Sequence, residues 1–312
     1  MPSTHQAIAD PRNEDILIYV DGEYAGRYEA KVSVFDSAFL VGDGIWEGIR
    51  LHHGQLAFLD RHLDRLFSAS ERTGIVLGMD RQGLSDLLYS VLDRNGMTHG
   101  VHVRLMVSRG RKKTPSQHPS NLVSGPTVVI IPEYKQADPS VARSGVRLFT
   151  SSVRRPPPNT LDQRINCHSK LHEVMALIEA VDAGCDEALM LDVNGHVATC
   201  NATNFFAVAD GQVWTSTGES CLPGITRGVV IEACENADIP IRVADFDLDL
   251  VHGADEAFVT GTFGGITAVR SVDGHEFGDG TMGPITARIS DLYESDVAVD
   301  VAKRGTGAGG DR

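Results

Sequence analysis

The sequence lacks the features that would place the protein outside the cell or in a membrane. Its five cysteines are odd in number and scattered, and no zinc-type CxxC pair occurs, so we expect neither a disulfide framework nor a metal site. No apolar run approaches the ~18 residues of a membrane helix. The polar first fifteen residues have no apolar core of a signal peptide. These absences favour a cytoplasmic protein with no membrane partner.

Basic residues are also scarce, with 28 lysines and arginines against 42 acidic residues and a net charge of −14. A chain of this charge repels nucleic-acid phosphates, so we expect no nucleic-acid partner. The exception is the basic run that begins at Arg109 and ends at Lys113. Two interpretations of Arg109 stay open, a loop that attracts a carboxylate substrate and a solvated loop.

The chain length of 312 residues suits one large domain or two medium ones. We expect a disordered N-terminus over 1–15, a domain over 16–135, a linker over 136–145, a domain over 146–300 and a flexible tail over 301–312. Hairpins and helices mix without strict βα repeats, which indicates an α+β fold.

Apolar periodicity and turn residues predict the individual elements. We expect strands over 16–20, 32–35, 101–108, 127–132, 146–151, 188–192, 204–209 and 256–260. We expect helices within 56–77 (ending near Gly74), 84–92, 166–181 and 225–237. Apolar residues of the third helix make one helical stripe: Leu171, Val174, Met175, Ile178 and Val181.

Three separate segments have donors that suit an anion. Residues 222–227 form a glycine turn that opens into a helix, where unpaired backbone N–H groups favour a negative charge. Residues 258–262 form a strand that ends in a Gly-Thr turn, and residues 62–66 contain Arg65 in an HxxRL pattern. Each pattern alone is also common in proteins that bind no anion.

Together with residues 34–50 and 272–286, these segments resemble the class IV (fold-type IV) aminotransferases. That family includes branched-chain aminotransferases, D-amino acid transaminases, (R)-amine transaminases and aminodeoxychorismate lyase. The resemblance covers residues 16–293 and implies a small N-terminal α/β domain, a larger C-terminal pseudo-barrel domain, a homodimer and a small-molecule substrate. It also implies pyridoxal 5'-phosphate as cofactor, with its phosphate bound by Arg65, Ile225, Thr226, Gly261 and Thr262.

Two positions depart from the family pattern. The family carries a helix lysine thirteen residues before the Glu-Ala pair that begins here at Glu179, and that position is Asn166. An amide cannot form the imine with the cofactor. The glutamate that pairs with the pyridine nitrogen in the family is replaced by Thr199, which carries no charge. Two coordinated losses indicate natural divergence rather than a single altered residue.

Residues near Asn166 are candidates for replacement chemistry. Lys170 lies one helical turn beyond Asn166 if 166–181 is helical, and it is either a substitute for the missing lysine or a solvated helix residue. Cys167 and His168 are a candidate nucleophile and base, with structural roles as the alternative. His168 and His172 have i, i+4 spacing, but no HExxH pattern accompanies them.

Two aromatic residues are candidates for the substrate pocket. We expect Trp46 and Phe39 to line or support its wall, with core packing as the alternative.

Three functions therefore stay open. The first is a pyridoxal-phosphate aminotransferase that acts on an amino acid, an amine or a keto acid with an unusual anchor. The second is an enzyme of the same fold that needs no cofactor and acts on a small phosphorylated or carboxylated molecule. The third is a non-catalytic paralogue that binds a ligand.

Overall fold

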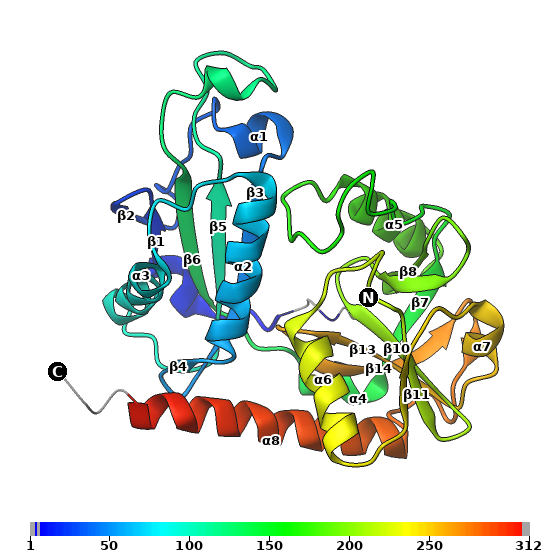
Figure 1. Ribbon diagram of the computed structural model, residues 1–312. Coiled ribbons are helices and arrows are strands. Elements are labelled where there is room, and N and C mark those ends of the chain that lie inside the picture. Colours follow the sequence, from blue (N-terminus) through cyan, green and yellow to red (C-terminus); the bar gives the residue numbers. More distant parts are fainter. Residues whose placement is uncertain (1–3, 5–6, 308–312) are drawn as a thin grey trace. The chain divides into compact units, whose positions relative to one another are not determined.

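The computed structural model describes Thr4 and residues 7–307 of the chain. These residues form two compact units (Figure 1). The N-terminal unit contains residues 8–136, 165–169 and 300–307, and the C-terminal unit contains residues 4, 7, 137–164 and 170–299. None of the helices in these described ranges is both long and apolar enough to cross a membrane.

The N-terminal unit is built on a six-stranded antiparallel sheet in the order β2-β1-β6-β5-β3-β4. Its strands are β1 (Leu17–Val20), β2 (Glu23–Gly26), β3 (Gly44–His52), β4 (Gln55–Leu56), β5 (Val101–Ser108) and β6 (Thr127–Tyr134). Its helices are η1 (Pro11–Asp15), α1 (Ser37–Val41), α2 (Leu59–Thr73), α3 (Arg81–Arg94) and η2 (Pro119–Asn121).

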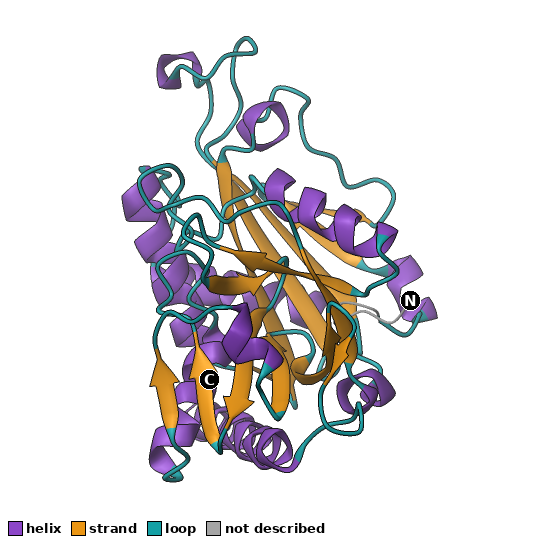
Figure 2. Ribbon diagram, turned by 90° about the vertical axis from the view of Figure 1, so that its right-hand side faces the viewer, coloured by secondary structure: helices purple, strands orange, loops and turns teal. Residues whose placement is uncertain are grey.

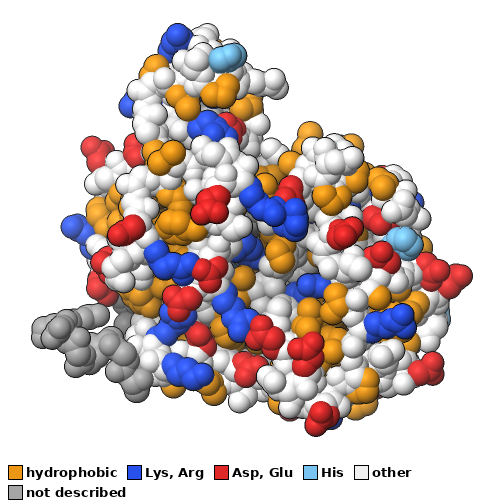
Figure 3. Space-filling view, viewed as in Figure 1, with side chains coloured by type: hydrophobic (Ala, Val, Ile, Leu, Met, Phe, Trp, Pro, Cys, Tyr) orange, Lys and Arg blue, Asp and Glu red, His pale blue; other side chains and the backbone are white. Residues whose placement is uncertain are grey.

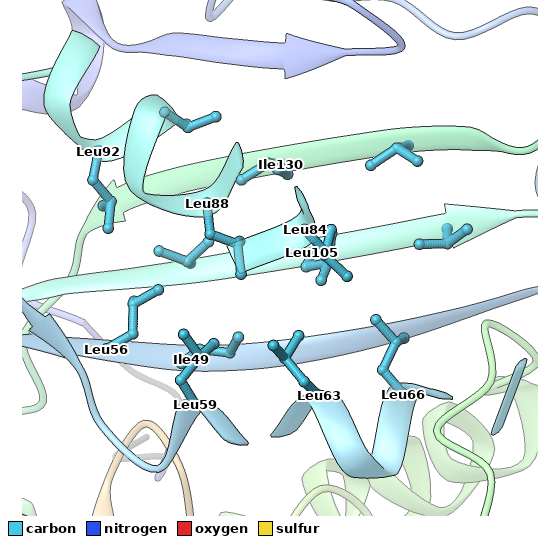
Figure 4. Packing of buried hydrophobic residues seen from close by; sticks show 14 of the residues in the cluster. Ile49, Leu56, Leu59, Leu63, Leu66, Leu84, Leu88, Leu92, Leu105 and Ile130 are labelled. Carbon is cyan, nitrogen blue, oxygen red and sulfur yellow. The ribbon is translucent and has the colours of Figure 1, made fainter. Parts of the chain in front are cut away.

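Leucines of α2 and α3 pack on this sheet and form its core. Figure 4 shows how leucines from both helices gather around β3, β5 and β6. Every second residue of β5 is buried, as expected for a strand with one face on a core. The residues in Figure 4 that make these contacts include Leu59, Leu63, Leu66, Leu84, Leu88, Leu92, Ile49, Leu105 and Ile130.

The C-terminal unit contains a nine-stranded mixed sheet in the order β12-β11-β10-β13-β14-β7-β8-β9, with β15 beside β14. Its strands are β7 (Val146–Thr150), β8 (Glu187–Leu191), β9 (Val197–Cys200), β10 (Asn204–Ala209), β11 (Gln212–Thr215), β12 (Ile241–Val243), β13 (Glu256–Gly261), β14 (Gly265–Val272) and β15 (His275–Glu276). The sheet curls, because the last strand of the order, β9, contacts β10.

Helices complete the C-terminal unit, and Figure 2 shows the mixture of helices and strands along the chain. They are α4 (Pro139–Ser144), α5 (Leu171–Asp182), α6 (Ile225–Asn236), α7 (Leu248–His252) and α8 (Pro284–Gly307), whose residues from 300 on belong to the N-terminal unit. The α+β class and the pseudo-barrel sheet predicted from the sequence are confirmed.

Most predicted elements match the structure, but the strand predicted over 32–35 is wrong. Hydrogen bonds to Ser33 close a turn there, from the Phe35 N–H to the hydroxyl (3.1 Å) and from the Asp36 N–H to the carbonyl (2.9 Å). Asp36 then accepts the Ala38 N–H and begins α1. The local turn therefore takes the donors that a strand would use.

Both predicted loose ends differ from the structure. Residues 11–15 form η1, and the Asn13 side chain exchanges hydrogen bonds with the Tyr134 backbone. Thr4 donates its N–H and its hydroxyl to the buried carboxylate of Glu187. At the other end α8 continues to residue 307, and Arg304 pairs with Asp60. Residues 1–3, 5–6 and 308–312, for which we also expected disorder, lie outside the described residues.

The predicted domain borders also shift. The linker expected over 136–145 contains α4, whose first turn is capped when the Asp138 carboxylate accepts the Ser140 N–H. Residues 165–169, expected within the second domain, belong to the N-terminal unit instead. A pattern of apolar residues does not reveal such a return of the chain to an earlier strand.

Glu256 joins the sheet to the start of α8. Its carboxylate accepts the backbone N–H groups of Ile285 (3.0 Å) and Thr286 (2.8 Å) and the Thr286 hydroxyl (2.6 Å). These contacts satisfy donors at a helix N-terminus that have no partner within the helix.

We predict that Glu256→Ala lowers the free energy of unfolding by about 2 kcal/mol, because three hydrogen bonds to a charged group are lost. Urea denaturation followed by circular dichroism measures this change. Glu235→Ala, at an exposed position of α6, is the control and changes stability little. Equal stability of the Glu256 variant and the wild-type chain would contradict the capping role.

Candidate functional site

Arg65 of the predicted phosphate cup is fixed by a buried carboxylate in the N-terminal unit. Its guanidinium donates from Nε to Oε1 of Glu47 (2.8 Å) and from Nη2 to Oε2 (2.7 Å). His62 Nδ1 lies 2.7 Å from the same Oε2. The side chains of Glu47 and His62 are each 1% exposed, so the three groups form a buried cluster between α2 and β3.

The contacts within the cluster determine the protonation states of Glu47 and His62. Burial alone would raise the pKa of Glu47, but the Arg65 guanidinium and the hydrogen bond from His62 together lower it. Burial lowers the pKa of His62, although the Glu47 contact opposes this shift. Glu47 is therefore a carboxylate and His62 a neutral ring that donates Nδ1–H. Two of the five guanidinium N–H groups thus orient Arg65.

The segment that carries Asn166 pairs with β3 instead of forming a helix. The Trp46 N–H donates to the Asn166 carbonyl and the His168 N–H donates to the Gly44 carbonyl, both at 2.9 Å. Cys167 and Ile45 form the bridge between these two hydrogen bonds. The prediction of a helix from 166 is therefore wrong for 166–170, since α5 begins at residue 171.

Asn166, which the sequence predicts at the family's lysine position, has an enclosed side chain. The residue is 4% exposed, and its Oδ1 makes no hydrogen bond with any described part of the chain. A buried amide oxygen without a donor costs free energy. This oxygen is thus an acceptor that a ligand N–H or O–H can satisfy, but it supplies no amine.

Lys170 does not lie one helical turn beyond Asn166, as the sequence predicted. It is the N-cap residue of α5 and lies in the C-terminal unit, whereas Asn166 lies in the N-terminal unit. Its Nζ pairs with Oε1 of Glu173 at 3.2 Å, and the same oxygen accepts Nη1 of the buried Arg155 at 2.8 Å. The one-turn helical displacement assumed for Lys170 is absent, and its amine is held in an ion pair.

The predicted histidine pair does not form on one helix. His168 belongs to the segment beside β3, where a Cβ at Gly44 would lie 2.6 Å from His168 Nδ1. His172 lies in the first turn of α5, and burial lowers its pKa despite the nearby Glu173 carboxylate. Among the described residues, no group of three or more potential metal ligands gathers.

The candidate Cys167 and a second cysteine, Cys200, differ in their surroundings. Cys167 is half-buried, and its Sγ lies 3.8 Å from the Ser169 carbonyl. Cys200, which follows Thr199, is buried, and burial raises the pKa of its thiol well above the ordinary value, with the Glu187 charge adding to the effect. A thiol that resists ionisation is a poor nucleophile, so Cys200 has a structural role.

Thr199, which the sequence predicts at the position of the family glutamate, lies in the C-terminal unit. It is 4% exposed on β9, and its hydroxyl donates to the Thr203 carbonyl at 2.8 Å. The Asn204 amide lies 3.4 Å from the same oxygen. Because the hydroxyl proton is given to Thr203, the group can only accept a further hydrogen bond, and it carries no charge to hold a protonated ring nitrogen.

Asn204 links Thr199 to the cup turn in the same unit. Its amide donates to the Leu222 carbonyl at 3.0 Å. A Cβ at Gly224 would collide with its Oδ1, so only glycine fits there. Gly224 is the N-cap of α6, and Ile225 and Thr226 begin the helix. Their N–H groups are among the four at a helix start that lack an intrahelical partner, and they suit an anion.

The second loop of the cup follows β13, where Gly261 and Thr262 lead into the turn to β14. Thr260 beside them is 1% exposed, and its hydroxyl has no hydrogen-bond partner in the described chain. A small pocket adjoins Gly261, but none of Ile225, Thr226 or Thr262 lines it. That pocket is lined by Thr4, Thr203, Val259, Gly261, Gly264, Gly265 and Thr267.

The predicted substrate residues have other partners. Arg109 binds Asp43 through Nε (2.7 Å) and Nη2 (3.0 Å), and it also donates to the carbonyls of Thr73 and Gly74. It therefore ties the end of α2 to the start of β3. Phe39 on α1 is 70% exposed, which excludes core packing.

Trp46 lies against Arg104, whose guanidinium carbon is 3.9 Å from the ring centroid. Its indole N–H donates to the Cys167 carbonyl at 3.2 Å. Trp46 thus supports the segment that carries Asn166.

The Glu47 cluster and the role of Asn204 were not predicted from the sequence. The sequence did contain a pattern that could have identified Glu47. Ile45, Ile49 and Leu51 alternate along β3 with Glu47 on the same side of the strand, and all three are buried. A charge on the buried side of a strand requires a partner. Asn204 gave no such signal, since its contact with Leu222 is made across the fold.

We predict that Glu47→Gln lowers the free energy of unfolding by about 3 kcal/mol, because the Arg65 guanidinium loses its buried charge partner. Chemical denaturation measures the difference. Glu71→Gln, at an exposed position on α2, is the matched control. A loss equal to that of the control would show that Glu47 does not anchor Arg65.

We also predict that stability falls as the pH drops from about 6.5 towards 4. Burial lowers the pKa of His52 to about 4, with Arg50, His99 and His53 adding repulsion, and burial lowers that of His62. The unfolded chain, whose histidines titrate near 6.5, then binds more protons than the folded chain. The lowered pKa of Glu47 also reduces stability at lower pH. The stability that the Glu47 carboxylate contributes is lost when the carboxylate is protonated.

Thermal unfolding at a series of pH values tests this dependence. His52→Gln flattens the profile between pH 6.5 and 4, and His275→Gln at an exposed position is the control. An unchanged profile in the His52 variant would contradict the assignment.

Comparison with known proteins places these motifs in one family. The model of the amino-transferase class IV family matches residues 44–272. Branched-chain-amino-acid aminotransferase-like protein 2 of Arabidopsis thaliana is 36% identical over 91% of this chain, which spans about half (51%) of that relative. A putative branched-chain-amino-acid aminotransferase of Methanocaldococcus jannaschii is 32% identical, over 89% of this chain and 95% of its own.

Solved structures agree with the sequence relatives. The branched-chain aminotransferase of Thermoproteus uzoniensis, solved with norvaline, has a TM-score of 0.82 and 27% identity, covering 92% of this chain and 96% of its own. The 4-amino-4-deoxychorismate lyase of Pseudomonas aeruginosa has a TM-score of 0.76 and 28% identity, covering 90% and 99%. With a family match over most of its length and the fold of these enzymes, the chain belongs to the class IV aminotransferases.

Proposed function

We propose that this chain binds a pyridoxal-phosphate-type ligand through its phosphate and without a covalent bond to lysine. In this proposal it acts on an amino acid, an amine or a keto acid by a route other than lysine-dependent transamination. The observation that carries the proposal is the enclosed side-chain amide of Asn166, whose main-chain carbonyl accepts the Trp46 N–H of β3. The family resemblance implies a lysine at this position.

The phosphate end of the cofactor fits the residues present. The N-terminus of α6 offers the N–H groups of Ile225 and Thr226, and the turn after β13 offers Gly261 and Thr262. In the N-terminal unit, Arg65, held by Glu47, is by itself a guanidinium of the kind that binds phosphate oxygens. Thr260, with its unsatisfied hydroxyl beside Gly261, is consistent with a polar ligand at this turn.

The reactive end of the cofactor does not fit. Pyridoxal phosphate supplies an aldehyde that forms imines with amines and a ring that withdraws electrons when its nitrogen is protonated. Asn166 supplies no amine, and Lys170 is ion-paired with Glu173. Thr199 gives its proton to the Thr203 carbonyl and supplies no charge. In this proposal, therefore, no lysine forms an imine with the cofactor.

A non-catalytic, ligand-binding role is the second candidate, because both positions that would drive the family chemistry are replaced by neutral, buried groups. It predicts the same binding but no turnover. An assay of amino-group transfer with amino acids, amines and keto acids separates the two proposals. We also propose a homodimer in the cytoplasm, consistent with five unpaired cysteines.

The first test is ligand-induced stabilisation. We expect pyridoxal 5'-phosphate and pyridoxamine 5'-phosphate to raise the melting temperature, because a ligand at 100 times its Kd stabilises the folded state by about 2.7 kcal/mol. Inorganic phosphate gives a smaller increase, and pyridoxal without phosphate gives little. Equal melting temperatures with and without the phosphorylated ligands would refute the intact cup.

The second test asks whether a lysine at 166 restores the covalent anchor. We predict that wild-type protein treated with pyridoxal phosphate and borohydride gains no mass, whereas Asn166→Lys gains one reduced pyridoxyl group per chain at residue 166. Lys170→Gln is the matched control and should bind ligand as wild type does. A wild-type adduct that disappears in Lys170→Gln would show instead that Lys170 replaces the missing lysine.

A further inference from the structure

Arg227 in the C-terminal unit is a buried cation whose contacts are all neutral. It is 8% exposed, and its guanidinium donates from Nη2 to the Ser216 carbonyl (2.5 Å) and from Nε to the Thr215 hydroxyl (3.4 Å). Burial lowers its pKa, and the group that opposes this shift is the Cys221 thiol and not a carboxylate. Within the part of the chain that the structure describes, Arg227 therefore forms no ion pair.

Arg227 differs in this respect from other arginines of the chain. Arg155 in the same unit is 3% exposed, but it pairs with the Glu173 carboxylate at 2.8 Å. Basic side chains on the face of the molecule in Figure 3 (blue) lie at the surface, where many have acidic neighbours (red). A buried charge without a partner costs free energy, which an anion beside it would offset.

The position of Arg227 within α6 increases this cost. The helix begins at Ile225, so Arg227 is its third residue, and the first turn contains no acidic side chain. The N-terminus of a helix carries a partial positive charge, which disfavours a cation in the first turn and favours an anion. The start of α6 thus combines the helix dipole with a full charge of the same sign, and one anion would offset both.

An unsatisfied hydroxyl lies on the sheet face that α6 covers. Thr260 and Phe258 point to the same side of β13, where Phe258 packs with Val230 of α6. Thr260 pairs in register with Asn204, whose side chain lies against the N-cap residue Gly224. Its hydroxyl has no hydrogen-bond partner among the described residues, and Thr260 is 1% exposed. A buried polar group of this kind beside the start of α6 indicates a polar ligand there.

These two features, an uncompensated charge and an unsatisfied hydroxyl, favour a ligand with a high negative charge. At an effective dielectric constant of about 20, a unit charge about 10 Å away changes the affinity of an anion by roughly tenfold for each charge on the anion. A phosphate monoester carries close to two negative charges at about pH 8. A sulfate monoester has the same shape and carries one. The phosphate monoester therefore gains more from Arg227.

We propose that Arg227 supplies the positive charge that makes the start of α6 selective for a doubly charged phosphate monoester. This inference rests on the proposed function, in which the N–H groups of Ile225 and Thr226 bind a phosphate, and it names the charge state that is bound and the residue that selects it. The hydrogen bonds of Arg227 go to Thr215 and Ser216. Arg227 is therefore a positioning residue that acts on the ligand through its charge.

Calorimetric titration of the full chain with pyridoxamine 5'-phosphate tests the contribution of this charge. We expect Arg227→Gln to weaken binding by about tenfold or more, whereas Arg227→Lys keeps the charge and recovers most of the affinity. Arg288→Gln is the matched control, because it removes an exposed arginine that donates to the Ala237 carbonyl in the same unit. Circular dichroism confirms that the variants fold.

Two small esters separate the charge of the ligand from its shape. Methyl phosphate and methyl sulfate, titrated at about pH 8 and followed by protein NMR, give two dissociation constants for each variant. The wild-type chain should bind methyl phosphate more tightly, and Arg227→Gln should reduce the ratio of the two constants by about tenfold. Arg227→Lys should keep the wild-type ratio. A substitution that only disturbed the structure would weaken both esters and leave the ratio unchanged.

The outcomes distinguish this inference from the proposed function. If neither pyridoxamine 5'-phosphate nor methyl phosphate binds the wild-type chain, the proposed function fails and the inference fails with it. If both ligands bind and Arg227→Gln keeps the wild-type ratio, the proposed function stands and the inference is overturned. Equal dissociation constants of the two methyl esters in the wild-type chain would overturn the inference without any variant.

Discussion

The pairing of residues 165–169 with β3 fixes the main chain at residue 166, where the proposed function has an amide in place of the family's lysine. Two backbone hydrogen bonds, from Trp46 to Asn166 and from His168 to Gly44, hold the segment against the strand. The indole of Trp46 adds a third contact, to the Cys167 carbonyl. The backbone of residue 166 is therefore held in place by its main-chain hydrogen bond, whatever its side chain. The side chain at this position is an amide.

Buried charged groups fix the remaining positions in each unit. In the N-terminal unit, Glu47 orients Arg65 and is itself bound by His62. In the C-terminal unit, Glu173 binds both Arg155 and Lys170. A buried carboxylate that holds two donors resists rearrangement, because loss of the carboxylate leaves a buried guanidinium without its charge partner. A buried carboxylate therefore orients Arg65 in one unit, and another pairs with Lys170 in the other unit.

The sequence predicted the fold class, most strands and helices, and the turn that begins α6, because these depend on local periodicity and on glycine positions. It did not predict that 166–170 leaves the helix, since that depends on hydrogen bonds to β3, more than one hundred residues earlier. Periodicity identified the apolar stripe of α5 (Leu171 to Val181) correctly but not its exposure. A helical period shows that one side is apolar and does not show whether the chain itself covers that side.

Thr199 and Asn166 give a consistent chemical picture of a family member with a changed centre. Both are neutral, both are buried, and each stands where the family resemblance expects an ionisable group. In the proposed function, the backbone N–H groups at the start of α6 and the turn after β13 bind a phosphate. A ligand held in this way is released without cleavage of a bond to the protein.

The most direct test of this account is a crystal structure of the chain with pyridoxal 5'-phosphate. The account predicts phosphate density against the N–H groups of Ile225 and Thr226 and no continuous density from the ligand to any lysine. Continuous density between the ligand and Nζ of Lys170 would contradict it.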